Sequence, residues 1–407
     1  MYLLLLIISI LSPLSFANSL FTVEMDLYVD HREYGQDKAI KYQIVHSVGP
    51  SMNKVRAGLR SSLNYNYSVS DLTSVDRGSF IRTNYKLRVE LLLENNTNPH
   101  NMNLIFPINP EIIFKKASRY RGKCAKSGYR GNARSFYWAW SPKVRGCKLK
   151  ENIDYIKVKP VVIEKKNDLD NHLSSEFLVN GEYHLYYYYG SDYFSLRRFG
   201  LAGSAYASLQ KKLKKRGFHS INTASFKSKA LEKQNITSNL KIYSGELNGA
   251  KAFVYMMLGN STEHTPRAKK EFFLFTKYAL ENGSSFTYSG HAGLGSVFNL
   301  DLQEKEYQMK INYNLNQKQL VFLDGCNTFF YSSNFFFRKK YLSNSLILVS
   351  NGLSISTKFY KQSVNTVFDI LGVKSFTNKD LVFKINSFMK YQGASKDQYA
   401  LVYALSN

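Results

Sequence analysis

Residues 284–300 read SSFTYSGHAGLGSVFNL, and residues 319–328 read QLVFLDGCNT. Each segment contains an apolar run with the composition of a β-strand, and each run is followed at once by one reactive side chain. Residues 286–290 lead to His291 in a glycine-rich turn, and residues 320–325 lead to Cys326. Ligands in an open α/β sheet bind beyond the carboxyl ends of the strands. If the two runs are neighbouring parallel strands, the imidazole and the thiol therefore meet at one edge.

A thiol beside an imidazole has the chemistry of a cysteine nucleophile, because the thiolate attacks and the imidazole manages its proton. Glycine near both residues leaves backbone N–H groups open to an oxyanion. Other interpretations stay open for each residue taken alone. A histidine in a glycine-rich turn can be a solvated loop residue, and a cysteine at a strand end can be a small buried hydrophobic residue.

The order strand–Ser-Gly-His-x-Gly, then strand–Asp-Gly-Cys, resembles the His/Cys dyad of the caspase–hemoglobinase superfamily, with Ala292 between His291 and Gly293. The resemblance covers about residues 181–371. It implies a largely parallel caspase-like sheet with flanking helices, in which Cys326 is the nucleophile and His291 is the general acid. It also implies that the backbone amides of Gly293 and Cys326 hold the oxyanion.

Asp324 precedes Cys326 by two positions, so both side chains point to the same side of a strand. In the clostripain-like branch of this superfamily, the matching aspartate lies at the pocket for the substrate residue before the cleaved bond. The resemblance therefore implies that Asp324 binds substrate and favours Arg or Lys there through charge-assisted hydrogen bonds. The alternative is that Asp324 caps a neighbouring turn or pairs with a local lysine.

The first 17 residues, MYLLLLIISILSPLSFA, have the features of a secretory signal peptide. An uninterrupted apolar core precedes Pro13, and residues 15–17 form a small-x-small cleavage site. We expect cleavage after Ala17 and export to the periplasm or the exterior. An N-terminal membrane anchor is the alternative. No later run approaches the ~18 apolar residues of a spanning helix, so no transmembrane segment is expected after cleavage.

The three cysteines divide into a pair and a single residue. Cys124 and Cys147 bracket a segment that contains Trp138 and Trp140, and in an oxidising compartment the pair predicts a disulfide-closed loop. This pairing leaves Cys326 unpaired. An unpaired thiol in an exported protein is chemically exposed, which supports a reactive Cys326, while a fully buried thiol remains the alternative.

The net charge is +25, from 55 Lys and Arg against 30 Asp and Glu. A basic exported protein is attracted to polyanions such as anionic envelope polymers. The densest cluster is KKLKKR at residues 211–216, which is expected on a helix and is also consistent with a plain solvent-exposed helix face. No metal, phosphate-loop or dinucleotide motif appears, and none indicates specific nucleic-acid recognition. We therefore expect no cofactor and no metal site.

The mature chain is expected to form two domains, residues 18–175 and 176–407. In the first, β-rich domain, strands are expected at residues 20–29, 40–48, 85–93 and 102–108. In the second domain, strands alternate with helices. A helix with an apolar stripe is expected to end at Gly217, and another is expected at residues 266–281. The predicted fold class is α/β, with a largely parallel sheet preceded by the smaller β-rich domain.

The sequence thus predicts an exported cysteine endopeptidase that uses His291 and Cys326 on protein or peptide substrates. The alternative, from a different class, is a non-catalytic cationic protein that binds envelope polymers or other polyanions and carries a degenerate copy of the second domain. Alkylation of Cys326 at neutral pH separates the two hypotheses, because only an activated thiol reacts fast.

Overall fold

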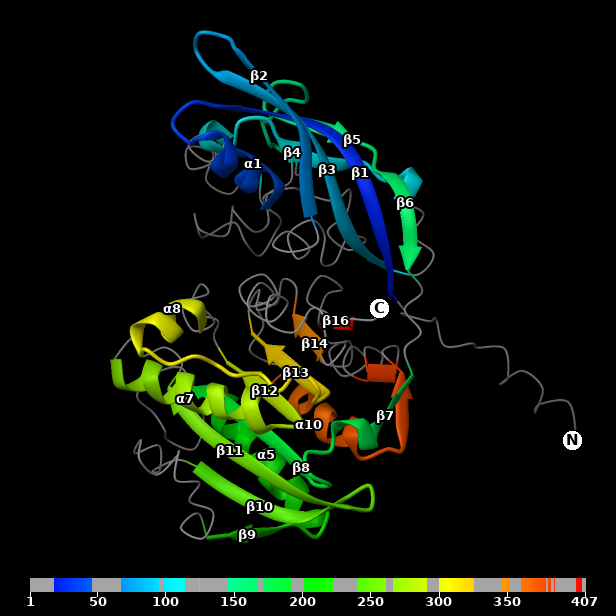
Figure 1. Cartoon of the computed structure of the whole chain (residues 1–407), viewed down its shortest axis with the longest axis vertical. Coiled ribbons are helices and arrows are strands. Elements are labelled where there is room, and N and C mark those ends of the chain that lie inside the picture. The colour runs from blue at the N-terminus through cyan, green and yellow to red at the C-terminus, as the bar shows by residue number, and fades with distance from the viewer. Residues whose placement is uncertain are drawn as a thin grey trace, which may run out of the picture. The chain divides into compact units, whose positions relative to one another are not determined.

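The computed structural model describes residues 18–45, 67–94, 99–113, 124, 142, 145–166, 171–191, 201–222, 240–260, 266–290, 300–325, 346–351, 360–377, 380–381, 384 and 400–404. These residues belong to two compact units, an N-terminal unit within Asn18–Asp168 and a C-terminal unit within Leu169–Asn407 (Figure 1). The boundary expected between residues 175 and 176 falls shortly after this division, inside a 3₁₀ helix, Ser174–Phe177.

The N-terminal unit is built on a four-stranded antiparallel sheet in the order β2-β3-β1-β6. Its strands are β1 (Asn18–His31), β2 (Tyr67–Asp76), β3 (Ile81–Glu94) and β6 (Val161–Lys166). Alternate residues of β1, such as Val23 and Met25, are buried, while Asp26 between Met25 and Leu27 is exposed. The period of two therefore decides which face of the sheet packs on the core.

The expectation of a strand at residues 40–48 is wrong, because helix α1 (Gln36–Val45) occupies this segment. Its buried positions Ala39, Ile40, Gln43 and Ile44 recur at helical spacing. The Gln43 amide donates to the backbone oxygens of Tyr28 and Pro107, both at 2.7 Å, and Gln43 Oε1 accepts from the Tyr85 hydroxyl at 2.5 Å. These distant partners satisfy a polar side chain inside the core.

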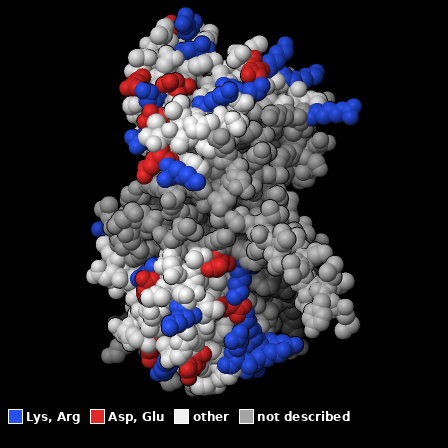
Figure 2. All heavy atoms as spheres, turned by 90° about the vertical axis from the view of Figure 1, so that its right-hand side faces the viewer, with Lys and Arg blue, Asp and Glu red and all other residues white. Residues whose placement is uncertain are grey.

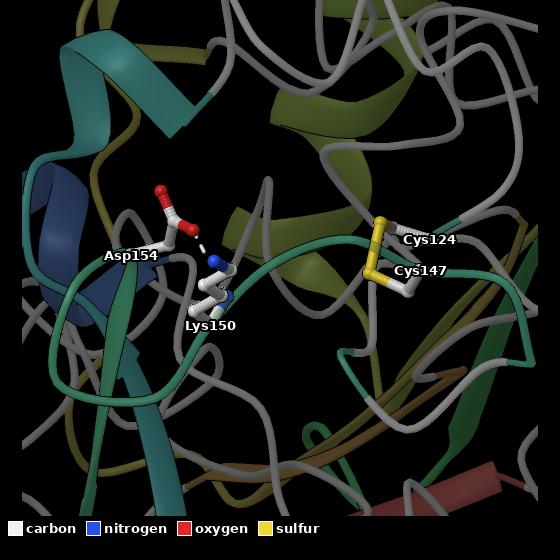
Figure 3. Close-up of a disulfide and its surroundings, with 4 residues drawn as sticks. All are labelled: Cys124, Cys147, Lys150 and Asp154. Atoms are coloured by element: carbon white, nitrogen blue, oxygen red, sulfur yellow. Dashed lines mark hydrogen bonds between the residues drawn. A yellow bond between two sulfur atoms is a disulfide. The ribbon is translucent and has the colours of Figure 1, made fainter.

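The short strands β4 (Leu104–Pro107) and β5 (Tyr155–Val158) form a second antiparallel pair in this unit. Nearby, the predicted disulfide is confirmed: Cys124 is bonded to Cys147, with 4.6 Å between the Cα atoms (Figure 3). The segment after Cys147 turns on Asp154, whose carboxylate accepts the Lys150 N–H at 2.9 Å. Trp138 and Trp140, expected inside the closed loop, lie outside the described residues.

The C-terminal unit contains an eight-stranded sheet in the order β16-β14-β13-β12-β8-β11-β10-β9. Its strands are β8 (Tyr183–Ser191), β9 (His219–Ile221), β10 (Leu240–Leu247), β11 (Ala250–Asn260), β12 (Ser285–Ser289), β13 (Gln319–Asp324), β14 (Leu346–Asn351) and β16 (Ala400–Ala404). A separate two-stranded sheet joins β7 (Asn171–Leu173) to β15 (Ser375–Thr377).

Helices cover both faces of the large sheet (Figure 1). They are α5 (Leu201–Lys215), α7 (Pro266–Asn282), α8 (Leu300–Glu306) and α10 (Tyr360–Leu371). Leu209 of α5 and Phe368 of α10 share one core cluster with Tyr187 and Tyr189 of β8. On the opposite face, Tyr186 packs edge-on against Phe275 of α7 at 5.8 Å between ring centroids. The helices expected at residues 266–281 and before Gly217 are confirmed.

The expected fold class, an α/β fold with a largely parallel caspase-like sheet, is wrong. Three of the four sheets of the described chain are antiparallel, and the eight-stranded sheet is mixed. Its strands β11, β8, β12, β13 and β14 are parallel, but β9, β10 and β16 add to the edges in antiparallel pairing. The sequence did carry one signal for this. Asn248 and Gly249, with φ of 51° and 78°, form a two-residue hairpin between β10 and β11.

Candidate functional site

The two motif strands are parallel neighbours. Strand β12 pairs with β13 from Ser285 opposite Leu320 to Ser289 opposite Asp324, and every residue of both strands is buried. The pairing continues one step further, because the Gly290 N–H donates to the Asp324 carbonyl oxygen at 3.0 Å. The ends of the two strands therefore lie side by side at the same edge of the sheet.

The two predicted catalytic residues, His291 and Cys326, lie outside the described residues, as does Gly293. The last described residues before them are Gly290 and Gly325. The structure thus places the residue that precedes each proposed catalytic side chain. Because Gly290 is hydrogen-bonded to Asp324, the last described residues of the two segments are neighbours.

Asp324 is 2% exposed at the end of β13. Its carboxylate accepts a hydrogen bond from the Ser289 hydroxyl at 3.5 Å, and Asp324 makes further contacts. Residues two apart on a strand share a face, so Asp324 lies on the face of Leu320 and Phe322, which pack with α5 and α10. The carboxylate is thereby held beside the strand that leads to His291. Its predicted role in substrate binding stays a prediction.

Four glycines stand in one line across the sheet at this edge, and we call them the glycine row: Gly259, Gly190, Gly290 and Gly325. Gly259 is opposite Gly190 in the β11–β8 pairing. A Cβ atom on Gly290 would lie 2.9 Å from the Gly190 Cα atom, and Gly325 follows Asp324 beside Gly290. Larger residues could not approach so closely. The glycine row was not predicted from the sequence, although each of the four apolar runs ends in a glycine.

A second candidate site is the basic end of α5. Lys211, Lys214, Lys215 and Arg216 are exposed. Asp369 of α10 accepts an ion pair from Lys212 at 2.6 Å and lies 4.0 Å from the Arg216 guanidinium. Burial lowers the pKa of Lys212, and the hydrogen bond to Asp369 opposes that shift. Figure 2 shows lysine and arginine side chains gathered on one part of the C-terminal unit. This surface has excess positive charge.

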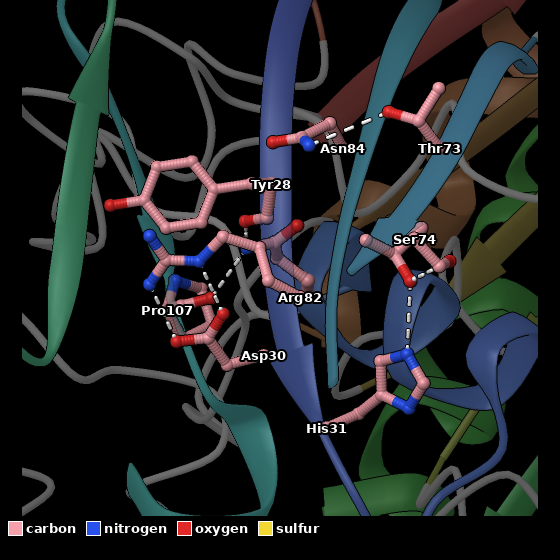
Figure 4. A network of polar contacts seen from close by, with 10 residues as sticks. Tyr28, Asp30, His31, Thr73, Ser74, Arg82, Asn84 and Pro107 are labelled. Atoms are coloured by element: carbon pink, nitrogen blue, oxygen red, sulfur yellow. Dashed lines mark hydrogen bonds and ion pairs between the residues drawn. The ribbon is translucent and has the colours of Figure 1, made fainter. Parts of the chain in front are cut away.

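The N-terminal unit has a polar network that joins three of its strands (Figure 4). The Arg82 guanidinium donates two hydrogen bonds to Asp30, at 2.7 and 2.8 Å, and lies 4.2 Å from the centroid of the Tyr28 ring. On the other face, a ring nitrogen of His31 is 3.0 Å from the Thr83 hydroxyl, which is 2.8 Å from the Ser74 hydroxyl. The network links β1, β2 and β3, so we assign it to stability.

The described residues contain no group of three or more His, Cys, Asp or Glu side chains that could hold a metal ion. Within the same residues, no helix is long and apolar enough to cross a membrane.

No family model matches the chain, and neither a curated protein nor a solved structure matches it significantly.

Proposed function

We propose that the protein is an exported cysteine endopeptidase in which Cys326 is the nucleophile and His291 manages the protons. One observation carries the proposal: the chain segments leading to the two residues are adjacent and parallel, and Gly290 is hydrogen-bonded to Asp324 at 3.0 Å. Nucleophilic catalysis requires the thiol and the imidazole to lie within hydrogen-bond reach, and adjacent parallel strand ends favour that placement.

The proposed reaction is hydrolysis of a peptide bond. The Cys326 thiolate adds to the carbonyl carbon, and the His291 imidazolium gives its proton to the leaving amine. Water then releases the acyl group, with His291 taking a proton from that water. Backbone N–H groups of Gly293 and Cys326 would stabilise the oxyanion, a contribution of about 3 kcal/mol in other hydrolases.

Export is part of the proposal. The first described strand, β1, begins at Asn18, directly after the proposed cleavage site at Ala17. The Cys124–Cys147 disulfide fits an oxidising compartment such as the periplasm or the exterior. We expect the purified exported protein to begin at Asn18, which N-terminal sequencing checks.

The proposal extends to substrate preference, which Asp324 would set. If the Asp324 carboxylate meets the substrate residue before the cleaved bond, peptides with Arg or Lys there should be cleaved best. Asp324→Asn should then reduce cleavage of basic peptides more than cleavage of a neutral peptide. Equal loss on both substrates would assign the buried carboxylate to holding the β12–β13 edge, a role that its contact with Ser289 also fits.

The decisive experiment is turnover of a mixed fluorogenic peptide library by the mature protein, with Cys326→Ala as the inactive control. Rapid alkylation of Cys326 by iodoacetamide at neutral pH should accompany turnover, because a low thiol pKa raises the thiolate fraction. A wild-type protein with no more activity than Cys326→Ala, and with an ordinary thiol reaction rate, would refute the peptidase proposal.

The exposed cations of α5 favour a second candidate function, the binding of anionic envelope polymers. Lys211, Lys214 and Lys215 are exposed on one short stretch of helix. Replacing all three by Glu should abolish retention on immobilised polyphosphate at physiological salt. The matched control reverses three other exposed lysines: Lys305, Lys310 and Lys374. Equal loss of retention in both variants would show that binding depends on the net charge of the protein and not on the α5 lysines.

A further inference from the structure

Two buried tyrosines direct their hydroxyl groups to the glycine row. A Cβ atom added at Gly259 would lie 1.9 Å from the Tyr188 hydroxyl oxygen, and one added at Gly290 would lie 2.8 Å from the Tyr288 hydroxyl oxygen. Both rings therefore extend along their strands toward the edge at which the proposed site lies. The glycines leave room for the two hydroxyl groups, because any side chain there would meet them.

The two rings have little freedom to move. Tyr288 is fully buried and Tyr188 is 1% exposed. Tyr288 is stacked on Tyr188 at 5.9 Å between ring centroids and lies edge-on to Phe272 of α7 at 5.6 Å. Tyr188 lies edge-on to the same Phe272 at 4.9 Å. Packing of this kind holds each hydroxyl group at one place on the sheet edge.

A phenylalanine would fill the same ring space without a polar atom. A buried hydroxyl group costs about 1–3 kcal/mol unless it makes a hydrogen bond, so tyrosine at this position favours a polar partner near the strand end. For Tyr288, the strand end is Gly290, which follows directly after β12. The Gly190 carbonyl oxygen lies 3.0 Å from the Cβ position at Gly290, so a main-chain acceptor lies close to this point.

We propose that Tyr288 is a positioning residue, whose hydroxyl group holds Gly290, the residue directly before His291, in place at the end of β12. The inference rests on the proposed function for its catalytic consequence. The contacts form one series: the Tyr288 hydroxyl lies at Gly290, and the Gly290 N–H is bound to the Asp324 carbonyl of the strand that leads to Cys326. A change at Tyr288 therefore reaches the relative placement of both proposed catalytic residues.

The test compares Tyr288→Phe with Tyr188→Phe. The control removes the same atom from the neighbouring ring of the same layer, but at Gly259 instead of Gly290. We expect kcat of Tyr288→Phe to fall about 10- to 100-fold with KM nearly unchanged, because small misplacements of catalytic groups cost that much. Tyr188→Phe should stay within about twofold of the wild type. Equal losses in both variants, or full activity of Tyr288→Phe, would overturn the inference.

A second readout does not depend on activity. Hydrogen exchange of the Gly290 amide should become about 10-fold faster in Tyr288→Phe and not in Tyr188→Phe, because its hydrogen bond to the Asp324 carbonyl oxygen then opens locally more often. The Leu320 amide, bound to the Ser284 carbonyl at 3.1 Å, serves as the reference for global stability. Unchanged exchange at Gly290 refutes the positioning role. Absent turnover with this exchange difference present would instead refute the peptidase proposal alone.

Discussion

Replacing Gly259 by alanine should strongly destabilise the C-terminal unit, and Tyr188 should be the reason. The added Cβ atom would lie 1.9 Å from the Tyr188 hydroxyl oxygen, 2.4 Å from its Cζ and 2.9 Å from its Cε2. These three nearest atoms all belong to the Tyr188 side chain, whose ring packs edge-on against Phe272 and cannot rotate away without disturbing α7. Overpacking of a core usually costs about 1–3 kcal/mol, and we expect the upper end here.

A double-mutant cycle isolates this contact. Tyr188→Phe removes only the hydroxyl oxygen, so in that background Gly259→Ala should remain costly because Cζ still blocks the methyl group. Tyr188→Leu removes all three overlapping atoms, and Gly259→Ala should then cost less than about 0.5 kcal/mol. The expected coupling energy between the two positions is about 2 kcal/mol or more.

The assay is denaturant unfolding followed by two signals. Both tryptophans, Trp138 and Trp140, belong to the N-terminal unit, so tryptophan fluorescence follows the unfolding of that unit. Far-UV circular dichroism also reports the unfolding of the C-terminal unit. Gly203→Ala is the control, because its Cβ would meet nothing within 4 Å in helix α5, and it should stabilise by about 0.5–1 kcal/mol. An equal cost of Gly259→Ala with and without the Tyr188 ring would refute the reasoning.

Three further predictions concern single features. Removal of the Cys124–Cys147 disulfide should destabilise the N-terminal unit by about 3 kcal/mol, read by tryptophan fluorescence, and an unchanged midpoint would contradict this. Asp30→Asn should lower the free energy of unfolding of the same unit by about 1–3 kcal/mol, because it weakens two hydrogen bonds from Arg82. Arg82→Lys should also destabilise this unit, because lysine cannot make the paired hydrogen bonds, and unchanged stability of that variant would contradict the prediction. Burial lowers the pKa of His184 against the opposing effect of Glu182, so the unfolded state binds a proton more readily. Stability of the C-terminal unit should therefore fall as the pH drops below about 6.5, and His184→Gln should flatten this part of the pH profile.

Local sequence patterns were sufficient to predict several elements of the structure. The alternating residues of β1 and the apolar runs of β12 and β13 were recognisable as strands because burial on a sheet follows a period of two or a continuous apolar run. Proline at the first helical position marked the start of α7 at Pro266. The disulfide followed from the number of cysteines and the expected compartment. In each case the deciding residues are neighbours in the sequence.

Tertiary structure decided that the α1 segment is a helix and that the edge strands of the large sheet pair in antiparallel direction. Residues 40–45 are apolar and polar in an order that suits either a strand or a helix, and Gln43 selects the helix by bonding to Tyr28 and Pro107. The antiparallel pairing of β10 with β11 depends on the Asn248-Gly249 turn. This turn is a local signal in the sequence, but the prediction of a parallel sheet followed the long apolar runs instead.

The sequence by itself determined which residues end the two motif strands, because strand ends and glycines can be read from local composition. Only the tertiary structure decided that Ser289 stands opposite Asp324 and that Gly259, Gly190 and Gly290 fall in one line. Strand order and register are set by pairing between segments far apart in the chain, and a slip of one residue would reverse every side chain. That long-range register brings the Tyr188 hydroxyl of β8 to Gly259 of β11.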